Sequence, residues 1–142
     1  MAQATTSTWA LAEAERAFGK ATAARRRASL LDRLRRRCAE CRRLTVHHVQ
    51  GAAAGGVVRD IPLSAITGSL EPNRAAQFDR EFRPAPLARS RWLRVWQAEQ
   101  RGAGLPPISV VAVRDGYAIR DGHHRVSVAR ARGALSIAAA IA

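Results

Sequence analysis

The chain has 142 residues, which suits one domain with a small appendage, and 47% of them are apolar, which is enough for a hydrophobic core. The formal net charge is +13, carried by 23 arginines and one lysine, Lys20. Arginine binds phosphate through two parallel hydrogen bonds, so this charge favours a nucleotide, DNA or another polyanion as partner. No run approaches the roughly 20 apolar residues of a membrane span. Residues 1–16 do not resemble a signal peptide, so we expect a cytoplasmic protein without a membrane partner.

The first third of the chain predicts two helices. Ser7 or Thr8 caps the first and Gly19 ends it, and the second runs from about residue 22 to residue 44. An apolar stripe along the second helix contains Cys38 and Cys41, which we therefore expect to be ordinary buried or half-buried thiols. Cys38 and Cys41 could form a zinc site together with His47 and His48, but the spacing of these four residues matches no common zinc module.

Arginine runs cover most of the remaining surface of the second predicted helix. Such a face is often only solvated, but a basic amphipathic helix is also typical of segments that lie on nucleic acid. The candidate nucleic-acid contacts are Arg25, Arg26, Arg27, Arg35, Arg36 and Arg37. We therefore predict a basic helical arm over residues 1–48, followed by a Gly/Ala linker over residues 49–56.

Residues 57–142 alternate between strand-like and helix-like segments. The predicted order is a strand at 57–66, a long loop, a helix at 89–100, a hairpin of strands at 106–113 and 116–119, a helix at 126–132 and a closing strand at 135–142. The predicted fold class is α+β, with a small mixed β-sheet and packed helices. A loop as long as 67–88 inside a compact domain is usually functional or mobile.

The stretch "DGHHR", residues 121–125, lies between a predicted strand and a predicted helix. Adjacent histidines project in different directions and chelate one ion poorly, so we expect no metal site. Gly122 leaves room for an anion, the first helical amides lack internal partners, and Arg125 adds a bidentate cation. For Asp121 three roles are open: it caps the helix, it bonds to a histidine ring, or it helps to bind a nucleotide with its metal ion. The alternative is a structural turn in which Asp121 caps the helix and His123 is a satisfied, partly buried ring.

Four segments, "IPLSAI", "NRAAQFD", "LPPISVVAV" and "GYAIRDGHHRVSVARARG", occur in an order that resembles the ParB/sulfiredoxin superfamily. The resemblance covers about residues 57–142. In ParB-type proteins a glycine-led box at this position binds nucleotide phosphate. The resemblance therefore implies phosphate or nucleotide binding by Asp121, Gly122, His123, His124 and Arg125. It also places Arg74 where the family has another motif, earlier in the chain, that contains an arginine. Sulfiredoxins carry their reactive cysteine where this chain has His123, so sulfinic acid reduction is not expected.

The leading hypothesis is a ParB-like protein that binds the phosphates of a nucleotide or nucleic acid, is DNA-associated or regulatory, and lacks a helix-turn-helix domain of its own. The alternative is an enzyme of the same fold, a nucleotide hydrolase or a small-molecule kinase similar to the free serine kinases. Its catalytic candidates are Asp121, His124 and Glu71. The implied cofactor is a nucleoside triphosphate, CTP or ATP, with Mg²⁺ and no protein-bound metal. The sequence leaves homodimer formation open.

Overall fold

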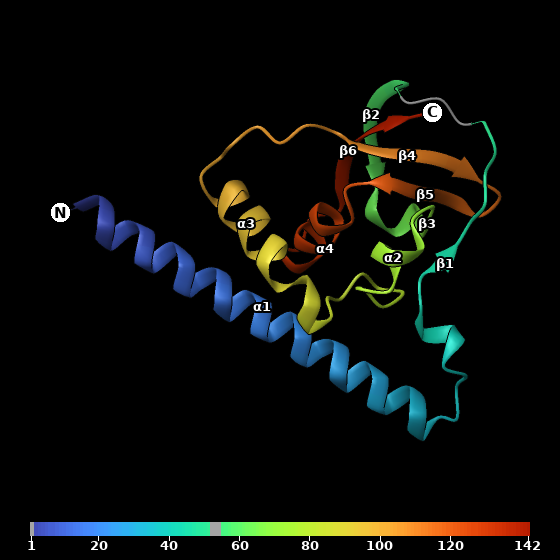
Figure 1. Ribbon diagram of the computed structural model, residues 1–142, viewed down its shortest axis with the longest axis horizontal. Coiled ribbons are helices and arrows are strands. Elements are labelled where there is room, and N and C mark those ends of the chain that lie inside the picture. Colours follow the sequence, from blue (N-terminus) through green and yellow to red (C-terminus); the bar gives the residue numbers. More distant parts are fainter. Residues whose placement is uncertain (1, 52–54) are drawn as a thin grey trace.

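The computed structural model describes residues 2–51 and 55–142, with side chains from Ser7 onward. Within these residues the chain forms a mixed α+β fold with four α-helices and a six-stranded sheet (Figure 1). The helices are α1 (Ala2–Leu34), α2 (Pro72–Ala75), α3 (Arg89–Gln100) and α4 (His123–Ala131). The strands are β1 (Thr45–Val46), β2 (Val57–Pro62), β3 (Ile66–Ser69), β4 (Ile108–Val113), β5 (Gly116–Asp121) and β6 (Ser136–Ile141). Short 3-10 turns cover Glu40–Arg42, Leu63–Ala65 and Pro86–Ala88.

The first third forms one long helix, α1, so the prediction of two helices separated at Gly19 is wrong. A glycine inside a helix costs about 1 kcal/mol, which the buried residues on either side outweigh. The helix also ends at Leu34, ten residues before the predicted end. Arg36 adopts a left-handed φ of 55°, and the Arg37 amide donates to the Asp32 carbonyl at 2.8 Å. These two features form a Schellman-type helix end.

The helices pack in layers against the sheet. Helix α1 lies along the outside of α3, and α3 packs on α4 (Figure 1). Phe18 of α1 contacts Trp92 of α3 with ring centroids 5.4 Å apart, and the Trp92 indole N–H donates to Ser127 Oγ at 2.8 Å. The residues before the predicted linker therefore share a hydrophobic core with those after it. Of that linker, residues 52–54 lie outside the described residues.

The sheet has the strand order β1-β3-β5-β4-β6-β2. The predicted hairpin is present as β4 and β5, and the predicted helix at 89–100 is present as α3. The predicted first strand is divided, because the chain leaves β2 at Pro62 and turns before β3. Strands β3 and β5 run parallel, so their carboxyl ends, Ser69 and Asp121, lie at the same edge as the start of α4. Helix α4 begins at His123, three residues earlier than predicted.

Candidate functional site

The turn between β5 and α4 depends on Gly122. Its φ is 118°, a conformation that residues with a side chain rarely adopt. A Cβ at this position would lie 2.4 Å from Cγ2 of Ile108. We predicted that the missing side chain leaves room for an anion, but Ile108 of β4 fills that space. The glycine is therefore needed for the turn and for its packing on the sheet.

His123 connects α4 to β3. The residue is fully buried, and its Nε2 lies 2.6 Å from Ser69 Oγ. Ser69 Oγ also accepts the Glu71 N–H at 2.9 Å and donates to the Glu71 carbonyl at 3.2 Å, so its second lone pair is available to an Nε2–H. Burial, then the charges of Arg74 and His124, lower the pKa of His123 to about 4. The ring is neutral at pH 7. The alternative of a structural turn predicted a satisfied, partly buried ring, but the ring is fully buried and no described group bonds its Nδ1.

His124 is 6% exposed and packs edge-on against Phe78, with ring centroids 5.1 Å apart. Burial lowers its pKa to about 4, and the charges of Arg91 and Arg74 act in the same direction. The charges of two guanidiniums from different helices, α2 and α3, therefore both disfavour protonation of this ring. We predicted Arg74 as a site residue but missed Arg91 of α3. The only sequence signal was its position beside the buried Trp92, which is not specific.

Arg125, which we predicted as a bidentate cation for phosphate, already has two partners in the structure. Its Nη1 donates to the carbonyl of Pro106, and its Nη2 lies 3.1 Å from Oδ2 of Asp121. The side chain is only 14% exposed. A guanidinium next to a carboxylate four residues away forms a charge-assisted bond that competes with an incoming anion. Asp121 consequently does not cap the helix, and no described side chain caps α4.

The other predicted catalytic residue, Glu71, precedes α2 and has an exposed side chain. Its backbone bonds to Ser69, whereas no described hydrogen bond joins its carboxylate to His124 or Asp121. Arg74 and Asp121 both act on the pKa of His123 and His124, whereas no described contact connects the Glu71 carboxylate to His124 or Asp121, so the three catalytic candidates do not form one hydrogen-bonded set.

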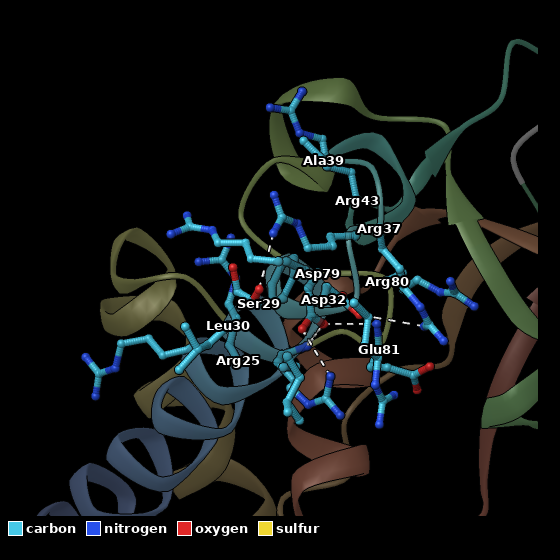
Figure 2. A pocket seen from close by; sticks show the side chains of 18 of the residues that line it. Arg25, Ser29, Leu30, Asp32, Arg37, Ala39, Arg43, Asp79, Arg80 and Glu81 are labelled. Atoms are coloured by element: carbon cyan, nitrogen blue, oxygen red, sulfur yellow. Dashed lines mark hydrogen bonds and ion pairs between the residues drawn. The ribbon is translucent and has the colours of Figure 1, made fainter.

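A cavity of about 1050 Å³ lies between the C-terminal part of α1, the segment that follows it and the loop after α2 (Figure 2). In Figure 2, Arg25 comes from α1, Arg43 from the segment before β1 and Arg80 from the loop. Nine arginines of the described residues line it: Arg25, Arg26, Arg33, Arg35, Arg37, Arg42, Arg43, Arg80 and Arg83. We call this cavity the arginine groove.

The groove forms because the chain reverses after α1. The Arg42 guanidinium donates to the Ser29 carbonyl at 3.2 Å, which holds the returning segment against the helix. The Arg80 amide donates to the Arg42 carbonyl at 3.0 Å, and Arg43 forms a β-bridge with Asp79. Three segments that are separate in the sequence thus meet around one cavity.

The prediction of nucleic-acid contacts can be compared with this lining. Arg25, Arg26, Arg35 and Arg37 line the groove, whereas Arg27 and Arg36 do not. The predicted set omitted the remaining lining arginines, Arg33, Arg42, Arg43, Arg80 and Arg83. Arg80 and Arg83 lie within the loop predicted at 67–88, and helical spacing carries no information about which loop side chains will face α1.

The carboxylates that line the groove each have an arginine partner. Asp32 lies 3.6 Å from Arg37, Asp79 3.2 Å from Arg83, and Glu81 2.9 Å from Arg130, which lies outside the groove lining. Among the residues that the structure describes, no carboxylate lies within ion-pair distance of Arg25, Arg26, Arg33, Arg35 or Arg43. The groove therefore keeps an excess of positive charge.

Cys38 and Cys41 are exposed and joined by a disulfide, so the prediction of thiols on a buried helical stripe is wrong. The apolar stripe that we predicted for the second helix also contained Leu31 and Leu34, which are 49% and 72% exposed in the structure. The reason is the left-handed Arg36, which ends the helix before either cysteine.

No group of three or more His, Cys, Asp or Glu side chains in the described part of the chain is placed to hold a metal ion. None of the described helices combines the length and the apolar character that crossing a membrane requires. Searches of family models, curated proteins and solved structures found no match to this chain.

Proposed function

We propose that the protein binds nucleic acid through the arginine groove, on a domain of the ParB/sulfiredoxin type. The observation that carries this proposal is the convergence of arginines from three segments on one cavity whose carboxylates are already paired. Guanidiniums without carboxylate partners bind phosphate oxygens bidentately and release counterions from the nucleic acid. The hairpin β4–β5 that leads through Gly122 into α4 supports the resemblance at the level of local structure.

The lining of the groove favours contacts with the backbone of a duplex. Phe78 is its one aromatic residue among those described, and it is 2% exposed. Single-stranded nucleic acid is usually held by exposed aromatic rings on which bases stack, and the groove has no such platform. Phosphate contacts alone carry no sequence information. We therefore expect binding to duplex DNA that depends strongly on salt and weakly on sequence.

A pair of charge-matched double variants tests this proposal. Arg26→Gln/Arg35→Gln removes two lining guanidiniums, whereas Arg27→Gln/Arg36→Gln removes two neighbours outside the lining. We expect the first variant to weaken binding to a labelled 20-bp duplex about tenfold, which corresponds to about 1.4 kcal/mol. Its slope of log K against log salt should become shallower by about 1.8, because each phosphate contact contributes about 0.9.

The control variant should bind within about twofold of the wild type, because every arginine that lines the groove is retained. It loses the same two charges as the first variant, so a difference between the two variants cannot come from net charge. Equal losses in the two variants would mean that net charge alone attracts DNA and that the groove is not the site. Binding to vesicles of anionic lipid without binding to the duplex would also contradict the proposal.

A second candidate function is the binding of a nucleotide phosphate at the start of α4. It is favoured by the uncapped amides of α4 together with Arg74 and Arg91, whose charges both act on His124. Arg125 does not contribute to this site, because Asp121 and Pro106 hold its guanidinium. The backbone amides and the two arginines would bind the phosphates, with Mg²⁺ carried by the nucleotide.

Calorimetry with CTP and ATP in the presence of Mg²⁺ tests this second candidate. Arg74→Ala and Arg91→Ala should each weaken binding at least fivefold, whereas Arg94→Ala, an exposed arginine of α3 that does not act on His124, should leave it unchanged. If no nucleotide binds the wild type, this candidate fails. Release of phosphate, or formation of phosphoserine from added serine, that is lost in His124→Ala would assign the enzymatic alternative.

A further inference from the structure

The disulfide between Cys38 and Cys41 lies within the wall of the arginine groove. Ala39, between the two cysteines, lines the cavity, as do Arg37 before the pair and Arg42 after it. Both cysteines are exposed, so small thiols in solution have access to the bond. The sequence motif Cys-x-x-Cys, which the proposed function does not use, is therefore located at the proposed binding site.

The turn closed by this disulfide touches both other walls of the groove. The Cys41 amide lies 3.1 Å from Cys38 Sγ, and the Cys41 carbonyl accepts a bond from the Arg80 guanidinium at 3.4 Å. The next residue, Arg42, accepts from the Arg80 amide and donates to the Ser29 carbonyl of α1. The position of the turn consequently determines how the helix wall and the loop wall face each other.

The only regular structure in this turn is the three-residue 3-10 segment Glu40–Arg42, which has no buried residue. A turn without core contacts depends on its covalent closure and on a few exposed hydrogen bonds for its order. Opening the disulfide restores the freedom of the residues between the two sulfurs. Arg37 then loses its fixed position relative to Arg42 and Arg43, which hydrogen bonds to Ser29 and Arg80 and the bridge to Asp79 still hold.

We propose that the Cys38–Cys41 disulfide is a redox clasp that sets the affinity of the arginine groove for nucleic acid; this inference rests on the proposed function. A low-molecular-weight thiol reduces the clasp in two steps. Its thiolate attacks one sulfur and the protein disulfide breaks, giving a mixed disulfide and a protein thiolate. A second thiolate then attacks the mixed disulfide. One protein disulfide and two thiols become two protein thiols and one small disulfide. Neighbouring arginines stabilise the departing protein thiolate.

Affinity for the labelled 20-bp duplex, measured at one salt concentration for the full chain before and after dithiothreitol, tests the clasp. Mass spectrometry after alkylation reports the state of the cysteines in each sample. We expect the oxidised protein to bind at least fivefold more tightly than the reduced protein. The Cys38→Ser/Cys41→Ser variant should match the reduced protein and should not respond to dithiothreitol.

Equal affinities of the oxidised and reduced proteins would overturn the clasp and leave the proposed function standing. Two free thiols in protein purified without reductant and treated with oxidised glutathione would also overturn it. Absence of duplex binding in both redox states would refute the proposed function, and the clasp with it.

Discussion

At the scale of single residues, the paired histidines are part of the core at the β5–α4 junction. His123 is bonded to Ser69, and both rings pack against Phe78. The pKa of each ring is lowered to about 4, chiefly by burial and then by arginine charges. Their neutral forms stabilise the fold, so protonation of the two rings opposes folding.

This arrangement predicts acid sensitivity. Because both folded-state pKa values lie near 4 and the unfolded value is 6.5, the unfolded chain binds more protons between pH 4 and pH 6.5. The stabilisation is therefore complete above pH 6.5 and is lost as the pH falls toward 4. Urea titrations should show a loss of about 2 kcal/mol per ring between pH 7 and pH 5.

Two variants separate the buried rings from other groups that titrate in this range. His124→Gln should lose about half of the pH dependence, and His48→Gln, at an exposed histidine, should keep all of it. A free energy of unfolding that stays constant between pH 7 and pH 5 would contradict the account of these rings.

At the scale of elements, the position at which α1 ends determines which arginines line the groove. The left-handed Arg36 turns the chain, and the following residues run back along the helix to form a second wall. A continuous helix to residue 44 would have distributed the same arginines around a solvated cylinder. The groove therefore depends on one helix terminus at which a residue with a side chain occupies a position that usually belongs to glycine.

The substitution Arg36→Gly should stabilise the protein by about 1 kcal/mol, because glycine adopts a left-handed conformation without the steric cost of a Cβ. The same substitution at Arg27, inside α1, should destabilise it by about 1 kcal/mol, and both remove one charge. Guanidinium chloride titrations of the two variants measure the difference. A loss of stability in Arg36→Gly would show that the left-handed turn is not the native end of the helix.

At the scale of the whole molecule, α1 is a structural layer and not a detachable arm. Ala14 and Phe18 are buried in the core, and β1, which follows α1, pairs with β3 in the sheet. The arginine groove and the start of α4 consequently belong to one packed unit. Removing the N-terminal third would expose Trp92 as well as remove arginines, so point substitutions in the groove are the better test of the proposed DNA binding.

Point substitutions in α1 test this layer directly. Phe18→Ala should lower the free energy of unfolding by about 3 kcal/mol, because it opens a cavity against Trp92. Trp9→Ala, at a side chain that is 66% exposed, should change it by less than about 0.5 kcal/mol. Equal stabilities of Phe18→Ala and the wild type in urea titrations would mean that α1 does not belong to the core.

Local signals in the sequence were sufficient for the features that depend on neighbouring residues. The strand-like runs at 106–113 and 116–119 and the turn at 114–116 predicted the β4–β5 hairpin, and the spacing of Trp92, Val95 and Trp96 predicted α3. The net charge of +13 follows from composition alone, and the polyanion partner inferred from it stays a prediction. The α+β class follows from the order of such local elements.

Only the tertiary structure decided which partner each side chain has. Arg125 is bonded to Asp121 and Pro106, and Cys38 is joined to Cys41. Arg80 and Arg83 line the wall opposite α1. Sequence spacing describes faces of one element, whereas these contacts depend on how elements far apart in the chain pack. The net positive charge could therefore be calculated from the sequence, whereas the arrangement of nine arginines around one groove depends on the fold.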